Sequence, residues 1–185
     1  EKGIVFCCFN SNHKISSSEF DIWMRVLRQV EGSVLWLKVS NKLAKENLYL
    51  AAKKRGVDQA RIIFAKQLPM DEHLARHALA DLFLDTFNFN AHTTACDALW
   101  AGLPIITKLG KSFVSRVAGS LLTAINLTEL ITNSEVEYEN LILKLATSPN
   151  ELEKIKQKLN KNRASKPLFD TKKYTLHQEK AYLLA

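Results

Sequence analysis

Residues 85–97 are best suited to form a phosphate-binding helix terminus. Their sequence, DTFNFNAHTTACD, follows a buried hydrophobic run, and His92, Thr93 and Thr94 stand where a helix is predicted to begin. The first turn of a helix leaves backbone N–H groups unpaired at the positive end of the helix dipole, and such groups bind anions. The two threonine hydroxyls add further donors. We therefore expect phosphate groups to bind at this helix terminus.

Asp97 lies one helical turn beyond the two threonines. It is spaced i+4 from Thr93 and i+3 from Thr94, so the three side chains share one side of the predicted helix. A carboxylate there can accept hydrogen bonds from a ribose diol while the helix terminus holds the phosphates. The alternative is a threonine that caps the helix and an aspartate that only faces solvent, and the local pattern leaves both open.

The loop after the first predicted strand supplies a cation. Residues 10–14 read NSNHK, so short polar side chains, Ser11 among them, and the ammonium of Lys14 can face a ligand at the same edge. The loop has no G-x-G-x-x-G pattern and the chain has no P-loop, so the sequence does not support an ordinary dinucleotide or ATP cradle. A simple turn that caps the next helix is the alternative interpretation.

Two histidines, His73 and His77, have the i, i+4 spacing that can bind zinc. Glu72 precedes His73 instead of following it, so the metalloprotease motif fails, and the sequence offers no third ligand. We therefore expect no metal site. His73 instead opens a helix after the third predicted strand, where its ring could stack on a base. The chain also lacks the G-x-S-x-G elbow of many hydrolases.

Short β-branched runs alternate with helical patterns along most of the chain. The predicted strands are residues 4–9, 34–39, 61–65, 82–86 and 104–107. The predicted helices lie between them, and after residue 111 the pattern indicates helices only, over residues 112–124, around 138–145 and 152–159, and over 171–184. This alternation requires a mostly parallel sheet with right-handed crossovers.

The predicted fold is therefore a doubly wound, Rossmann-like α/β domain with additional C-terminal helices. We expect one domain over residues 1–185, with a sheet core over about 1–125 and a helical part over about 126–185. Such sheets bind ligands beyond the carboxyl ends of their strands, where the strand order switches. The candidate loops are residues 10–17, 40–41, 65–72, 86–93 and 108–112.

Composition narrows the class of protein. The 185 residues are 46% hydrophobic and 24% charged, as in an ordinary globular domain, and no apolar run is long enough to span a bilayer. Three cysteines are an odd count, and adjacent Cys7 and Cys8 point to opposite faces of a strand, so we expect a reducing cytoplasm. The net charge of +7 is concentrated in residues 151–185, which hold nine Lys or Arg against four acids. A solvated helix face explains this better than a nucleic-acid patch, so neither nucleic acid nor membrane is an expected partner.

Ordered blocks along nearly the whole chain resemble one family. They are FCCFN at 6–10, KI at 14–15, VLWL at 34–37, RIIF at 61–64, EH at 72–73, LDT at 84–86, HTT at 92–94 with Asp97, LWAG at 99–102, SRV at 115–117, PLFDT at 167–171 and YT at 174–175. Their order and spacing resemble the C-terminal catalytic lobe of protein O-GlcNAc transferases and their SPINDLY-like relatives, as in the bacterial members. The resemblance implies one lobe of a two-lobed GT-B glycosyltransferase.

The resemblance also implies roles for the residues of the phosphate site. Lys14 contacts the diphosphate and acts in catalysis, because its charge stabilises the leaving group. His92, Thr93 and Thr94 bind the same diphosphate at the helix terminus. Ser11 belongs to the same UDP site.

The nucleoside would lie beside it, with His73 packed against uracil and Asp97 holding the ribose. The implied reaction inverts the anomeric carbon and needs no metal or other cofactor, since an acceptor hydroxyl displaces UDP. Two positions depart from the animal members of the family, which usually carry Gln at the position of Ser11 and Lys at the position of Met70. The second departure removes a donor beside the nucleotide.

We expect the chain to be one half of a larger enzyme, because it shows neither an N-terminal lobe nor tetratricopeptide repeats. The implied enzyme transfers N-acetylglucosamine from UDP-GlcNAc to Ser or Thr of a protein acceptor, which the other lobe and the repeats would hold. The isolated chain would then bind UDP without turnover. The alternatives are a non-catalytic nucleotide- or protein-binding module, or another GT-B sugar-nucleotide enzyme such as an epimerase.

Overall fold

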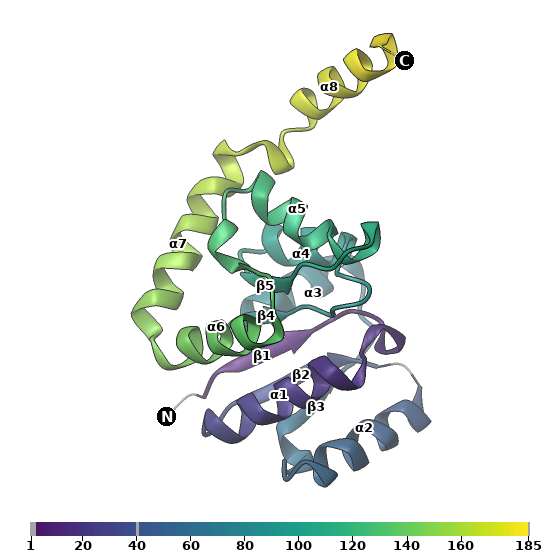
Figure 1. Ribbon diagram of the computed structural model, residues 1–185, viewed down its shortest axis with the longest axis vertical. Coiled ribbons are helices and arrows are strands. Elements are labelled where there is room, and N and C mark those ends of the chain that lie inside the picture. The colour runs from purple at the N-terminus through teal and green to yellow at the C-terminus, as the bar shows by residue number, and fades with distance from the viewer. Residues whose placement is uncertain (1–2, 40, 185) are drawn as a thin grey trace.

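A six-stranded parallel sheet forms the centre of the computed structural model, which describes residues 3–39 and 41–184 (Figure 1). The strands are β1 (Val5–Cys8), β2 (Val34–Lys38), β3 (Ile62–Ala65), β4 (Leu82–Leu84), β5 (Ile105–Lys108) and β6 (Ile131–Thr132). Their order in the sheet is β3-β2-β1-β4-β5-β6, and every neighbouring pair is parallel. This arrangement confirms the predicted doubly wound, Rossmann-like fold.

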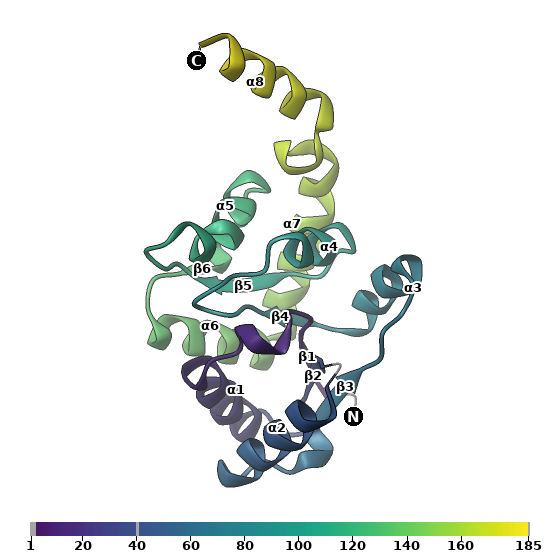
Figure 2. The ribbon, with the colours of Figure 1, turned by 90° about the vertical axis from the view of Figure 1, so that its right-hand side faces the viewer.

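Apart from the last one, the eight α-helices of the described residues lie over the two faces of the sheet. They are α1 (Ser17–Gln29), α2 (Lys42–Lys54), α3 (Met70–Ala75), α4 (Thr93–Trp100), α5 (Val117–Ala124), α6 (Glu135–Thr147), α7 (Pro149–Ser165) and α8 (Thr171–Leu184). Figure 2 shows α1 and α6 on one side of the sheet and α4 and α5 on the other. Right-handed crossovers place α1 and α4 on opposite faces, since the chain winds outward from β1 in one direction and from β4 in the other. α6 follows the last strand and packs beside α1.

Short 3₁₀ segments connect several of these elements. They are η1 (Asn12–Lys14), η2 (Gln59–Arg61), η3 (Arg76–Leu79), η4 (Phe113–Ser115), η5 (Thr128–Leu130) and η6 (Pro167–Phe169).

The central strands are apolar on both faces because helices cover both faces. Cys7 pairs with Trp36 of β2 and with Phe83 of β4, and Cys7 and Cys8 are fully buried. Both thiols are free, as their alternation on the strand predicts. The core is therefore continuous through the sheet.

Local sequence signals explain where the main helices begin and end. A capping box between Ser16 and Glu19 starts α1. Gly102, with a φ of 84°, follows α4 and turns the chain into β5, a conformation that side chains with a Cβ rarely adopt. Both helices lie between predicted strands, as the alternation predicts.

The prediction that only helices follow residue 111 is wrong, because Ile131 and Thr132 form β6 at the edge of the sheet. Thr107 pairs with Ile131, and Thr132 Oγ1 donates to the Thr107 carbonyl at 3.0 Å. Two residues are too few for a hydrophobic period to appear. The helix predicted over 112–124 is also divided, into η4 and α5.

The two C-terminal helices differ in how they contact the body. α7 buries Leu152 and Leu159, whereas α8 has no buried residue and extends away from the sheet (Figures 1 and 2). Leu168 and Phe169, just before α8, pack against the core, but Leu176 within it is 57% exposed. None of the helices within the described residues is long and apolar enough to cross a lipid bilayer.

Candidate functional site

The strand order switches between β1 and β4, and the loops after these two strands meet there. Beyond the carboxyl end of β4, residues 85–92 form a compact loop that leads into α4. Within it, Thr86 Oγ1 donates to the Phe89 carbonyl at 2.6 Å, and Asn90 Nδ2 donates to the Thr86 carbonyl at 2.8 Å. Asn90 N also donates to the Val114 carbonyl at 2.9 Å. These bonds fix the point at which α4 begins.

The first turn of α4 presents donors that no protein group satisfies. His92 is the N-cap, and its carbonyl accepts from the N–H groups of Ala95 and Cys96, while its side chain makes no cap bond. Within residues 3–39 and 41–184, the backbone N–H groups and hydroxyls of Thr93 and Thr94 have no hydrogen-bond partner. Threonine therefore does not cap this helix, and its first turn keeps the unpaired donors that an anion site requires.

Lys14, in η1, reaches this loop from the carboxyl end of β1. Its Nζ lies 3.9 Å from the centre of the Phe89 ring and 3.3 Å from the carbonyl oxygen of Asn90, two residues before His92. Partial burial lowers the pKa of Lys14, and the negative charge of Asp85 acts in the opposite direction. The structure thus brings Lys14 and the α4 N-terminus together, as the sequence predicts.

Aromatic contacts surround the His92 ring. It stacks on Phe89 at a centroid distance of 4.8 Å and an interplanar angle of 26°. Its Nε2 lies 3.3 Å from the Val114 carbonyl, a contact that requires the hydrogen on Nε2. The ring of Phe113, which is 79% exposed, lies edge-on to the His92 ring at a centroid distance of 6.4 Å. Lys14, Phe89 and His92 therefore form one stack beside the helix terminus.

An open pocket of about 400 Å³ lies next to this terminus, between the carboxyl ends of β1, β2 and β3 and helix α4. Four of the predicted site residues line it: His73, Thr93, Thr94 and Asp97. The other lining residues are Phe9, Lys38, Gln67, Leu68, Met70 and Arg76. Loops from different strands thus converge on one cavity large enough for a nucleoside.

His73 forms an aromatic wall of this pocket. Its ring centroid lies 5.8 Å from that of Phe9 and 4.8 Å from that of His77, and the Arg76 guanidinium hydrogen-bonds to its Nδ1. Burial and the charge of Arg76 lower the pKa of His73 to about 4. The ring is therefore neutral near pH 7.

Asp97 lies on the same side of α4 as Thr93 and Thr94, as the helical spacing predicts. Partial burial raises its pKa, and the positive fields of His77 and Lys38 oppose that rise. A half-buried carboxylate at a pocket wall is an acceptor for hydroxyl donors.

Ser11, like Lys14 and His92, does not line this pocket. It is exposed, and its carbonyl accepts the backbone N–H of Lys14 at 2.9 Å. The structure therefore shows Ser11 shaping the turn that carries Lys14.

Sequence reasoning missed two cations of the pocket, Lys38 and Arg76. Arg76 is only 6% exposed, and its guanidinium carbon lies 4.7 Å from the centre of the Phe9 ring. Its i+3 spacing from His73 was the available signal. Lys38 ends β2, and nothing in its local pattern distinguishes it from a solvent-facing lysine.

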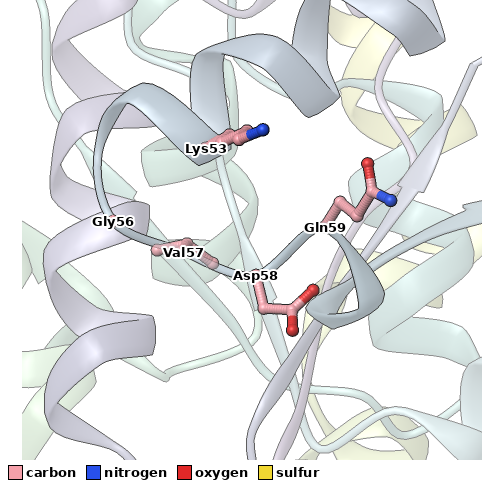
Figure 3. Close-up of a pocket in the computed structure, with 5 residues that line it drawn as sticks. All are labelled: Lys53, Gly56, Val57, Asp58 and Gln59. Atoms are coloured by element: carbon pink, nitrogen blue, oxygen red, sulfur yellow. The ribbon is translucent and has the colours of Figure 1, made fainter.

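A second cavity, of about 420 Å³, lies at the amino end of β3, where α2 leads into that strand (Figure 3). Lys53, Gly56, Val57, Asp58 and Gln59 line it. Asp58 already caps η2 by accepting from Ala60 N, and no aromatic side chain or free helix terminus faces this cavity. It lacks the convergent groups of a nucleotide site.

Metal ligation has no visible basis in the part of the chain that the structure describes. No group of three His, Cys, Asp or Glu side chains gathers there in a way that could hold a metal ion. His77 is buried and uses Nδ1 on the His73 carbonyl at 2.8 Å, so it lies behind His73, which lines the pocket.

Comparison with known protein families agrees with this geometry. The family model described as glycosyl transferase family 41 matches residues 1–178. The chain belongs to this family. The resemblance found in the sequence blocks is thereby confirmed.

Two relatives carry names that include an activity. The chain is 38% identical over 174 residues to a UDP-N-acetylglucosamine–peptide N-acetylglucosaminyltransferase of Caenorhabditis elegans, which covers 94% of this chain and 15% of the relative. It is 36% identical over 183 residues to the probable enzyme SEC of Arabidopsis thaliana, an alignment that covers 98% of this chain and 19% of the relative. The chain thus spans less than a fifth of the length of these relatives.

Solved structures show the same fold. A mutant O-GlcNAc transferase of Thermobaculum terrenum superposes with a TM-score of 0.93 at 28% identity, over 98% of this chain and 36% of that one. Anabaena HepE in complex with UDP and glucose gives a TM-score of 0.66 at 14% identity, over 99% of this chain and 48% of HepE. The fold is therefore that of a GT-B glycosyltransferase lobe.

Proposed function

We propose that this chain is the donor-binding half of a protein glycosyltransferase that transfers N-acetylglucosamine from UDP-GlcNAc to a Ser or Thr hydroxyl. The observation that carries the proposal is the meeting of two features at the carboxyl ends of the strands. One is the α4 N-terminus with its unpaired donors beside Lys14. The other is the adjoining pocket that holds His73 and Asp97.

Each feature suits one part of a nucleoside diphosphate. The N–H groups and hydroxyls of Thr93 and Thr94 would bind the diphosphate oxygens, with His92 and Lys14 alongside. The neutral His73 ring would stack on uracil, and Asp97 would accept from the ribose hydroxyls. Ser11 would contribute by holding the turn that carries Lys14.

The proposed reaction is an inverting displacement that needs no metal. The acceptor oxygen forms a bond to the anomeric carbon, and the bond from that carbon to the β-phosphate oxygen breaks with its electron pair on UDP. The hydroxyl proton passes to a base that we place outside this chain. Lys14 and the α4 terminus would stabilise the charge that develops on the leaving diphosphate, which is preorganised electrostatic catalysis.

The partner groups of this half lie in the remainder of the enzyme. Because the chain spans less than a fifth of the relatives, we place acceptor binding and the proton acceptor in an N-terminal lobe with helical repeats, and we propose that this chain alone binds UDP without turnover. The relatives' names support the choice of donor and acceptor.

Calorimetric titration of the chain with UDP, UDP-GlcNAc and ADP tests this proposal, with mass spectrometry of an acceptor protein incubated with the full-length enzyme. We expect UDP and UDP-GlcNAc to bind, ADP to bind more weakly, and N-acetylhexosamine to appear on Ser or Thr. No heat with millimolar UDP, or release of free sugar only, would contradict the proposal.

A further inference from the structure

Asp85 is a buried carboxylate surrounded by neutral hydrogen-bond donors. It follows β4 and is 0% exposed. Its Oδ1 accepts from Thr86 N at 2.8 Å, Ala91 N at 2.7 Å and Asn10 Nδ2 at 3.2 Å, and its Oδ2 accepts from Thr107 Oγ1 at 2.7 Å. No cation pairs with it among residues 3–39 and 41–184.

Asp85 and its side-chain donors come from three neighbouring strands at the point where the strand order switches. Asn10 follows β1, Thr107 belongs to β5, and Asp85 follows β4. The carboxylate therefore ties together the carboxyl ends of β1, β4 and β5. A group buried this deeply requires its full set of donors, because an unsatisfied charge there is costly.

The same oxygen also closes the loop that leads into α4. Thr86 N and Ala91 N, at the two ends of that loop, both donate to Oδ1. Ala91 directly precedes His92, the N-cap of α4, and the neighbouring Asn90 carbonyl accepts from Lys14 Nζ at 3.3 Å. A shift of Ala91 would therefore move both the helix terminus and the ammonium.

We propose that Asp85 is the positioning residue of the diphosphate site, which holds the α4 N-terminus and Lys14 in register through Ala91 and Asn90. The inference rests on the proposed function of that site. Asp85 touches no ligand itself and acts through the loop and Lys14. When ionised, Asp85 also favours the protonated form of Lys14, whose pKa burial lowers.

The test separates binding of the phosphates from binding of the nucleoside. Asp85→Asn keeps an acceptor oxygen for the two backbone donors but removes the charge and places an NH₂ group toward Thr107. We titrate wild type and variant with UDP and with uridine, following amide shifts by NMR. If the substitution only lowers the stability of the fold, the affinities for UDP and uridine change by the same factor. If it displaces the diphosphate site, only the affinity for UDP falls.

We expect Asp85→Asn to weaken UDP binding about tenfold or more, since a displacement of the phosphate-binding groups by about 1 Å has effects of that order. Uridine binding should weaken by less than about twofold. The matched control is Asp81→Asn, at the opposite end of β4, where Asp81 Oδ2 accepts from Val5 N. It leaves the ratio of UDP to uridine affinity within about twofold of wild type, as a substitution away from the site does.

Thr107 supplies a second, milder pair of variants that decides the matter if Asp85→Asn does not fold. Thr107→Val removes the donor to Oδ2 and weakens UDP binding about threefold, and Thr107→Ser restores it. Equal loss of UDP and uridine, or unchanged UDP affinity in these variants, overturns the inference. A wild-type chain that binds uridine but not UDP contradicts the proposed function, and this inference with it.

Discussion

Lys14 lies across the face of Phe89, with its Nζ 3.9 Å from the ring centre, and Phe89 in turn stacks on His92. A cation over an aromatic face is attracted to the ring while it keeps its charge. The contact places the ammonium beside the loop that leads into α4. Lys14 and the helix terminus can then act on the same diphosphate.

Replacing Lys14 tests its contact with phosphate. Lys14→Ala removes a charge-assisted contact, so we expect UDP binding to weaken by about 1.5–3 kcal/mol, with uridine binding nearly unchanged. Isothermal titration calorimetry measures the loss. Lys53→Ala is the matched control, because Lys53 lines the second cavity, at the amino end of β3 (Figure 3). We expect it to leave UDP affinity at the wild-type value. An unchanged affinity in Lys14→Ala would favour a binding module that does not use this lysine.

Replacing His73 tests base stacking. His73→Phe keeps a flat ring, while His73→Ala removes it and should weaken UDP and uridine alike by about 1–3 kcal/mol. The pKa of His73 is about 4, so its ring gains no proton between pH 5.5 and 8. Wild type and His73→Phe should therefore show parallel pH profiles of UDP affinity in that range. A step in the wild-type profile that His73→Phe lacks would show that a charged His73 contributes.

Much of this site could be predicted from the sequence because its signals are local. The threonines and Asp97 share one face of α4 by helical spacing, and Gly102 marks where that helix ends. The structure confirms that Thr93 and Asp97 line one pocket together with His73. Their roles toward UDP stay predictions.

The rest depends on contacts between distant residues. Asp85 contacts Asn10 and Thr107, which lie 75 and 22 positions away, so no pattern within one segment shows that it is buried. The Lys14–Phe89 contact joins two loops in the same way. β6 is only two residues long and forms because β5 offers it an open edge, so its short segment carries no periodic signal.

Burial of Asp85 predicts a pH-dependent stability. Desolvation raises its pKa from 3.8 to about 7 in the folded chain, so the folded state binds a proton that the unfolded state has released. This contribution to stability is fully present below about pH 3.8 and is lost as pH rises to about 7. Urea unfolding of wild type and Asp85→Asn at pH 5, 6 and 7 measures it.

The free energy of unfolding of Asp85→Asn relative to wild type should rise over that series, by on the order of a few kcal/mol. Thr107→Val should raise the pKa of Asp85 further, because the Thr107 hydroxyl stabilises its charged form. The fall in the free energy of unfolding should then continue to higher pH than in wild type. If the free energy of unfolding changes with pH in the same way for wild type and Asp85→Asn, the raised pKa of Asp85 is contradicted.

Removing α8 tests whether that helix contributes to the stability of the lobe. It buries no residue, so deletion of residues 171–185 should change the free energy of unfolding by less than about 0.5 kcal/mol and leave UDP affinity unchanged. Leu159→Ala in α7, a fully buried position, should cost about 2–5 kcal/mol in the same assay. A large loss on deletion would show that α8 packs against this lobe in solution.

The central claim is that UDP binds with its diphosphate at the N-terminus of α4. An NMR titration of the ¹⁵N-labelled chain with UDP measures this directly through the amide shifts. We predict the largest changes at the amides of His92, Thr93 and Thr94, with smaller ones around His73 and none around Gly56. Saturable shifts that cluster elsewhere, with the α4 amides unmoved, would contradict it.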